Sequence, residues 1–144
     1  MPRLINTSFI LLISIWAGWT QAADDVQITI SNIKNTQGQL IVELFDGEKT
    51  FLEKPAARKI IPIDASLKAQ IVFSDIKPGV YAATAIHDAN ANSKVDTNFI
   101  GIPKEDIAFS NGAVPNRGAP KFKDAKVTVD DAHRVIELKF ISSK

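Results

Sequence analysis

The chain has 144 residues, of which 45% are hydrophobic, and its 17 Lys and Arg nearly balance its 16 Asp and Glu. This length and composition suit one domain with one core. The absence of cysteine excludes disulfides, thiol catalysis and cysteine-ligated zinc or iron–sulfur centres. No run of basic residues predicts binding to nucleic acid or to an anionic membrane.

Residues 1–22 have the pattern of a secretory signal peptide. Arg3 precedes the apolar run FILLISIWAGW, and the small residues Thr20 and Ala22 come before the polar boundary ADD. The run is shorter than the ~20 residues that span a bilayer, which argues against a retained anchor. We expect cleavage after Ala22, no stable membrane anchor afterwards, and an exported domain of residues 23–144, periplasmic or extracellular. Its formal charge would be near zero, since only Arg3 is lost from the charged residues.

Strand character recurs along the mature chain in seven segments: 26–31, 39–45, 57–63, 69–73, 80–87, 126–129 and 134–141. The first, VQITIS, alternates apolar and polar residues as a half-buried strand does. Turn residues NTQG separate it from the second, QLIVELF, so we expect these two segments to form a β-hairpin. In the third, Pro62 is compatible only with an edge strand or a bulge.

The later segments are also separated by turn residues. Pro78 and Gly79 suit the two central positions of a type II turn, because glycine there accepts a positive φ. KVTV and RVIELKFI flank the turn DDAH and predict a second hairpin, with Ile136, Leu138 and Phe140 on one face.

Helical periodicity is scarce, and the segment GEKTFLEKPA (47–56) holds at most a turn of helix. Regularly spaced short strands with turns between them predict an all-β domain. We therefore expect an antiparallel β-sandwich of about seven strands, of the immunoglobulin-like or transthyretin-like kind, with a barrel as the alternative.

Oxygen-bearing side chains alternate along HDANANSKVD, directly after an apolar run. Counted from Asp88 as position 1, Asn90, Asn92 and Asp96 occupy positions 3, 5 and 9, and Lys94 at position 7 would offer its main-chain carbonyl. Calcium takes six to eight oxygens, and loops of the form D-x-[DN]-x-[DN]-G supply them at this spacing. Either the loop binds one calcium ion, or its side chains form Asx turns that satisfy the loop backbone.

The match to a calcium loop is incomplete. Position 6 holds Ser93 where the sharp turn favours glycine, at a cost of about 1 kcal/mol, and position 12 holds Phe99 in place of glutamate. Val95 has the apolar character that would anchor such a loop to the core. With only two carboxylates we expect a weak site, with a Kd of about 10⁻⁴–10⁻³ M, unless Glu105 or Asp106 completes the ligand shell.

A longer pattern runs through the second half of the chain. Its positions are Gly79, Tyr81, Ala82, His87, Asp88, Asn90, Asn92, Lys94, Asp96, Asn98, Gly101, Pro103, Glu105, Phe109, Ser110, Asn111, Pro120, Phe122, Asp124 and Ala125. This pattern of G-x-Y-A, H-D-x-N-x-N-G-K-x-D-x-N, G-x-P-x-E-G and P-x-F-x-D-A resembles the DUF2141 family of small exported bacterial proteins, whose members have no established function.

The chain departs from the family pattern at Ser93, Asp106 and Ala108, where family members usually have glycine. Those departures bear on the geometry of the loop and therefore on its affinity for a cation. The loop is also similar to those of calcium-stabilised sandwich repeats in bacterial surface proteins, which is a likeness at the level of the fold alone.

His87 and His133 are the only histidines. His87 adjoins Asp88, which can orient an imidazole for base or metal chemistry, but adjacent side chains on a strand point to opposite faces. Nothing marks Ser110 as sitting on a nucleophile elbow. We expect His87 to end a strand and donate a hydrogen bond into the following loop, His133 to lie solvated in a turn, and the protein not to be an enzyme.

The aromatic residues Tyr81, Phe99, Phe109 and Phe122 either fill the core or line a ligand groove. Phe99, together with Ile100, is expected to pin the long loop down. The sequence favours an exported, non-enzymatic β-sandwich module of unknown partner, in which calcium is a structural ion. One alternative is a small-molecule or peptide-binding protein with residues 88–111 as a lid; another is a hydrolase that uses His87.

Overall fold

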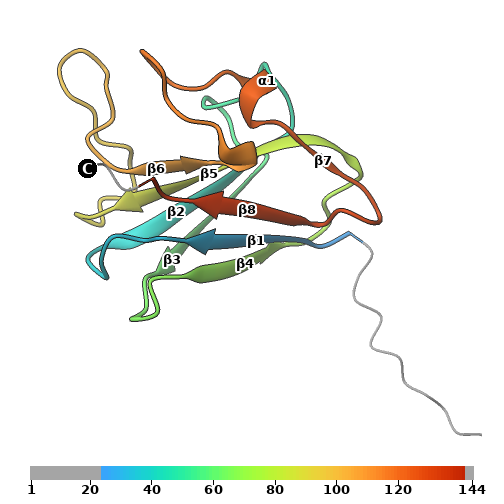
Figure 1. Ribbon diagram of the computed structural model, residues 1–144, viewed down its shortest axis with the longest axis horizontal. Helices are drawn as coiled ribbons and strands as arrows, with labels where there is room; N and C mark the ends of the chain where they lie inside the picture. The colour runs from blue at the N-terminus through green and yellow to red at the C-terminus, as the bar shows by residue number, and fades with distance from the viewer. Residues whose placement is uncertain (1–23, 142–144) are drawn as a thin grey trace, which may run out of the picture.

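Two β-sheets stacked face to face contain nearly all the regular structure (Figure 1). The computed structural model describes residues 24–141, and the predicted signal peptide, residues 1–22, lies outside them. The elements are β1 (Val26–Ser31), β2 (Gln39–Phe45), β3 (Ala57–Pro62), β4 (Ala69–Phe73), β5 (Gly79–Asp88), β6 (Ile107–Phe109), η1 (Ser110–Gly112), α1 (Phe122–Ala125), β7 (Val127–Val129) and β8 (Val135–Lys139). This confirms the predicted all-β sandwich. Among the described residues, no helix has the length and apolar character to cross a membrane.

The seven predicted strands are all present. β6 is an eighth strand, and its three residues are too few to give a recognisable strand pattern in the sequence. The smaller sheet has the order β4-β1-β8. The larger sheet has the order β3-β2-β5-β6, and β7 pairs with the first residues of β5. All pairings are antiparallel except that of β1 with β8, which is parallel. Pro62 ends β3 at the edge of the larger sheet, as predicted.

Both predicted hairpins are wrong. β1 pairs with β4 and β8, whereas β2 pairs with β3 and β5 in the other sheet. β7 pairs with β5, whereas β8 pairs with β1. The short connections that look like hairpin turns therefore carry the chain from one sheet to the other, so that strands adjacent in sequence bury their apolar faces against each other across the core.

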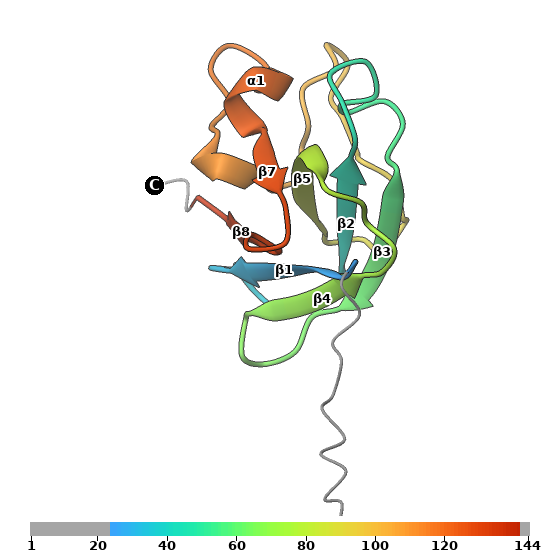
Figure 2. The ribbon, with the colours of Figure 1, turned by 90° about the vertical axis from the view of Figure 1, so that its right-hand side faces the viewer.

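The core lies between the inner faces of the two sheets. Its buried side chains include Val26, Ile28, Ile30, Leu40, Val42, Leu44, Ala83, Ala85, Ile136, Leu138 and Phe140. The alternation predicted for β1 and β8 is confirmed, because their intervening residues are more exposed. Figure 2 shows β1, β4 and β8 together on one side of the molecule, with α1 at the end away from them.

The larger sheet is also covered on part of its outer face. There the ring of Phe51 packs edge-on against Phe45 and Phe122, with ring centroids 5.4 and 5.7 Å apart. Phe51 belongs to the segment 47–56, which forms hydrogen-bonded turns with one helix-like bond from the Lys54 N–H to the Thr50 carbonyl. Residues 82–88 of β5, the strand that pairs with β2, are buried on both faces.

The predicted type II turn at residues 78 and 79 is wrong. Gly79 begins β5, and the residue with positive φ in this connection is Asp75, at 62°. The Tyr81 ring lies over Gly79, where an added Cβ would be 3.2 Å from the ring, and the Tyr81 hydroxyl donates to the Lys77 carbonyl at 2.9 Å. Glycine therefore leaves room for a tyrosine that ties the start of its own strand to the preceding connection, as in the tyrosine corner of other sandwiches.

Candidate functional site

The connection between β5 and β6, residues 89–106, forms a long loop beyond the end of the larger sheet (Figure 1, upper left). It follows Asp88, the last residue of β5, which pairs with Gln39 of β2. Gly38, just before Gln39, has a φ of +76°, and a Cβ there would lie 2.0 Å from the Asp88 carbonyl oxygen. The connection between β1 and β2 therefore packs directly against the start of the loop.

Asp88 organises the first half of the loop. Its side chain is fully buried, and its carboxylate accepts hydrogen bonds from Gln39 Nε2 at 2.8 Å, the Ser93 N–H at 2.7 Å and the Asn92 N–H at 3.1 Å. Burial alone would raise the pKa of Asp88, but hydrogen bonds from Gln39 and from the loop backbone outweigh it, and the pKa lies below its ordinary value. Asp88 is therefore ionised at neutral pH and held in one place.

Asp96 receives the side chains of the two loop asparagines. Asn90 Nδ2 donates to its carboxylate at 2.6 Å and Asn92 Nδ2 at 2.9 Å. The Asn90 and Asn92 side-chain oxygens accept from main-chain N–H groups two residues further on, at 3.2 and 2.9 Å. These are Asx turns, so the loop side chains satisfy the loop backbone, as the second of the two hypotheses for this loop predicted. Ser93 has the positive φ, 64°, that its position predicts.

Glu105 comes from the far end of the loop to the same place. Its Oε2 accepts the Asp96 N–H at 3.2 Å. Burial raises the pKa of Glu105, and the negative charges of Asp88 and Asp96 raise it further, against the Asp96 hydrogen bond, which lowers it. The sequence suggested that Glu105 or Asp106 could complete the site. The structure brings Glu105 close to Asp96, whereas the Asp106 main-chain carbonyl accepts the His87 N–H.

These residues provide the donor set that calcium prefers, namely carboxylate and amide oxygens. In the present arrangement the amide nitrogens of Asn90 and Asn92, not their oxygens, face Asp96. Within residues 24–141 no three Asp, Glu or His side chains are grouped closely enough to hold a metal ion as they stand. Rotating each side-chain amide by a half-turn would exchange its nitrogen and oxygen and bring the oxygens to Asp96. The Lys94 side chain is exposed.

The histidines and Ser110 have structural contacts. His87 points to the inner face, opposite to Asp88, where its Nε2 donates to the Gln37 carbonyl at 2.8 Å and its ring packs against Phe140. The predicted hydrogen bond therefore exists, but it goes to the β1–β2 connection and not to the following loop. Ser110 Oγ donates to the Ala125 carbonyl at 2.6 Å and accepts the Ala83 N–H at 2.8 Å. His133 is exposed in its turn, as predicted.

Three expectations for apolar loop residues are wrong. Val95 does not anchor the loop to the core, since it is 40% exposed, and Phe99 and Ile100 do not pin the loop down, since they are 98% and 63% exposed. The other aromatic residues that could have lined a ligand groove pack against the protein: Phe109 is buried, Phe122 packs on Phe51, and Tyr81 packs against the core. The loop is held by its hydrogen bonds and not by hydrophobic burial.

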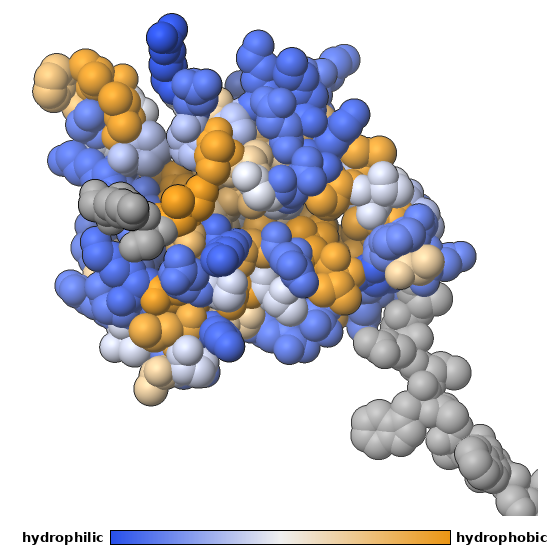
Figure 3. Space-filling model, in the orientation of Figure 1, coloured by the Kyte–Doolittle hydropathy of each residue, from blue (hydrophilic) through white to orange (hydrophobic). Residues whose placement is uncertain are grey.

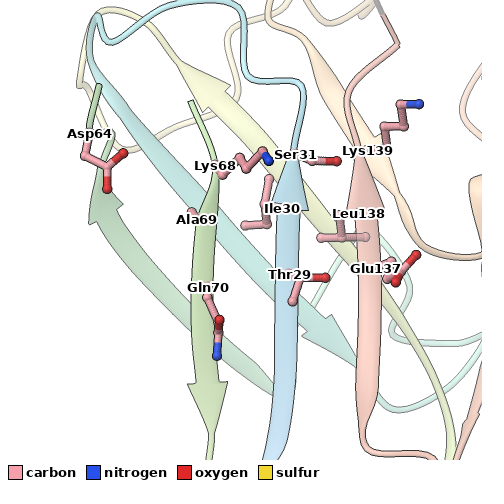
Figure 4. Close-up of a pocket in the computed structure, with 10 residues that line it drawn as sticks. All are labelled: Thr29, Ile30, Ser31, Asp64, Lys68, Ala69, Gln70, Glu137, Leu138 and Lys139. Atoms are coloured by element: carbon pink, nitrogen blue, oxygen red, sulfur yellow. The ribbon is translucent and has the colours of Figure 1, made fainter. Parts of the chain in front are cut away.

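One hollow lies away from the long loop. A shallow open groove of about 590 Å³ crosses the outer face of the smaller sheet (Figure 4). Its lining is mixed: the polar residues Thr29 and Ser31 of β1 lie between Gln70 of β4 and Glu137 and Lys139 of β8, and Ile30, Ala69 and Leu138 add apolar surface. None of its lining residues belongs to 88–111, so this groove has no lid from the long loop.

Comparisons with known proteins place the chain in a family. Residues 28–137 match the model of a family described as an uncharacterized protein conserved in bacteria, DUF2141. No curated protein and no solved structure matches the chain. The matched residues run from β1 to β8 and include the whole of the loop around Asp88 and Glu105. Because the match covers most of the sequence, the chain belongs to the DUF2141 family.

Proposed function

We propose that the protein is an exported, non-enzymatic β-sandwich module in which the loop around Asp88 binds one structural calcium ion. The observation that carries the calcium proposal is the position of Glu105. Glu105 contacts the Asp96 N–H, its pKa is raised by burial and then by the negative charges of Asp88 and Asp96, and a bound cation would relieve that repulsion on Glu105. Asp88, Asn90, Asn92, Asp96, Glu105 and the Lys94 carbonyl would hold the ion.

The same contacts support a non-catalytic role. His87 and Asp88 project from opposite faces of β5, so they do not form a base and its orienting carboxylate. Ser110 is buried, and its hydroxyl donates to one main-chain carbonyl and accepts from one main-chain N–H. The apolar segment ahead of residue 23, with its small-residue boundary, supports export. The module would act in the periplasm or the extracellular space and bind a partner in the cell envelope or in solution.

A thermal melt tests the calcium proposal. In 10 mM calcium after EDTA treatment, a site with a Kd of about 10⁻⁴–10⁻³ M should add about 1.4–2.7 kcal/mol of stability, or roughly 5–10 °C in Tm. Magnesium at the same concentration should give a smaller shift, because it requires a tighter octahedral shell.

Asp96→Asn is the diagnostic variant. Asp96 is half-buried and its carboxylate accepts only amide donors, so its loss should change the Tm little in EDTA and remove the calcium shift. Asp75→Asn, at an exposed aspartate far along the chain from the loop, is the matched control and should keep the shift. Equal melts in calcium and EDTA for the unmodified protein would mean that the Asx turns alone order the loop.

A further inference from the structure

The tip of the long loop, residues 97–103, exposes a cluster of apolar side chains. Phe99 is 98% exposed, and Ile100 and Ile102 are 63% and 55% exposed. Figure 3 shows orange side chains projecting at the upper left, where Figure 1 places this loop. Single exposed apolar residues are common on protein surfaces, but an uncovered phenylalanine beside two isoleucines marks a surface that meets something else.

The backbone of the tip is fixed by hydrogen bonds. Asn98 Oδ1 accepts the N–H groups of Ile100 at 3.0 Å and Ile102 at 2.9 Å, and the Asn98 N–H donates to the Ile102 carbonyl at 2.8 Å. Gly101 supplies the left-handed φ of +81° that the turn needs, and Thr97 pairs with Pro103 below it. The turn therefore presents its apolar side chains in a set arrangement, so binding costs less conformational entropy.

The charged residues around the tip differ in exposure. The carboxylates of Asp96 and Glu105 are occupied inside the loop, by the two asparagine amides and by the Asp96 N–H. Lys94 and Lys104, which flank residues 97–103 in the sequence, are exposed. Asp106 is half-buried, as are Asp96 and Glu105, so the exposed charged residues of 89–106 are the two lysines, one on each side of the apolar tip, although the domain as a whole is close to neutral.

We propose that residues 97–103 insert into the surface of an anionic lipid bilayer. An apolar tip with flanking lysines matches the interface of such a membrane, where hydrocarbon lies below a layer of negative head groups. A protein partner is less favoured, because three side chains cover far less than the ~800 Å² that each side of a stable protein interface buries. This proposal goes beyond the structural calcium ion and does not depend on it.

Phe99→Trp provides a direct test. Both tryptophans of the sequence, Trp16 and Trp19, lie in the predicted signal peptide, so a chain begun at residue 23 and carrying this substitution has a single tryptophan, at the tip. That chain keeps every strand of both sheets. Its emission should shift to the blue and become quenched by brominated lipid tails on mixing with phosphatidylcholine vesicles that contain phosphatidylglycerol. The mixing is done in EDTA, so that calcium proposed for the neighbouring loop plays no part.

Co-sedimentation with the same vesicles measures the energetics through variants. Phe99→Ser should lower the partition coefficient about tenfold, and replacing each lysine by glutamine should lower it roughly fivefold. Val135→Ser is the matched control, since Val135 is 57% exposed on the smaller sheet, and it should bind as the unmodified protein does.

Two results would overturn the proposal. One is an absence of vesicle binding, or binding that Phe99→Ser leaves unchanged while circular dichroism confirms folding. The other is a dimer in sedimentation velocity that Phe99→Ser dissociates, which would make a second copy of the chain the occupant of the tip. Equal binding to vesicles of phosphatidylcholine alone would overturn the role of the lysines and with it the choice of an anionic surface.

Discussion

Replacing Asp88 tests whether a buried carboxylate organises the loop and one end of the larger sheet. Three donors converge on it, from Gln39, Asn92 and Ser93, and the side chain is fully buried. A hydrogen bond to a charged group contributes about 1.5–3 kcal/mol. Because Asn92 is exposed and Ser93 only half-buried, we expect water to replace part of these bonds in Asp88→Ala, and the loss to be about 3–4 kcal/mol and not the full sum.

The isosteric change Asp88→Asn refines this estimate. It keeps one acceptor oxygen but turns an amide NH₂ toward groups that themselves donate, so we expect a loss of about 2 kcal/mol at neutral pH. Equilibrium unfolding in urea, in EDTA, gives both values. Asp96→Asn is the comparison variant, because its carboxylate is more exposed, and it should lose less than about 1 kcal/mol.

The pH dependence of the same variant has a defined sign. The folded pKa of Asp88 lies below its ordinary value, so ionised Asp88 stabilises the fold above its unfolded pKa of about 3.9 and loses that contribution as pH falls through the folded pKa. The difference in unfolding free energy between the unmodified protein and Asp88→Asn should therefore be constant near neutrality and shrink below about pH 4. A loss under 1 kcal/mol at pH 7, or a difference independent of pH down to 2, would refute the reasoning.

Four further substitutions test other features of the structure. Gly38→Ala should cost more than about 3 kcal/mol in urea unfolding, since its Cβ would meet the Asp88 carbonyl at 2.0 Å; a folded variant of unchanged stability would contradict that contact. Ala91→Gly should raise stability by up to about 1 kcal/mol by relieving a φ of 55°, and Ser93→Gly by less, because it also loses the hydroxyl bond to Gln39. Ser110→Ala should lower the calorimetric Tm, at a cost of about 2–4 kcal/mol for two unpaired main-chain groups; an unchanged Tm would show that those groups find other partners.

The strands could be predicted from the sequence because their side chains alternate, but their partners could not. VQITIS and QLIVELF each bury one apolar face, and that pattern is the same whether the two segments pair side by side or face each other across a core. The turn residues between them therefore did not distinguish a hairpin from a crossing between sheets. What decides the pairing is register with distant strands, such as Val42 opposite Ala85, which no local pattern encodes.

The candidate site was predictable to a similar extent. The spacing from Asp88 to Asp96 anticipated both the Asx turns and the positive φ at Ser93, because these follow from local backbone geometry. It could not place Glu105, whose contact with Asp96 depends on how the whole loop returns to β6. The expectation that Phe99 is buried was wrong because hydrophobicity predicts burial only on average, and Phe99 lies at an exposed tip.

The parallel pairing of β1 with β8 bears on when the protein can fold. The smaller sheet has β1 at its centre, and one of its two neighbours is the last strand of the described chain. Nearly the whole domain must be present before that sheet can close, and the loop it closes carries a large entropic cost. In a growing chain the smaller sheet would thus stay open until synthesis is almost complete, which would suit the proposed export of the chain before it folds. Loss of β8 should accordingly leave an unfolded chain and not a smaller sandwich.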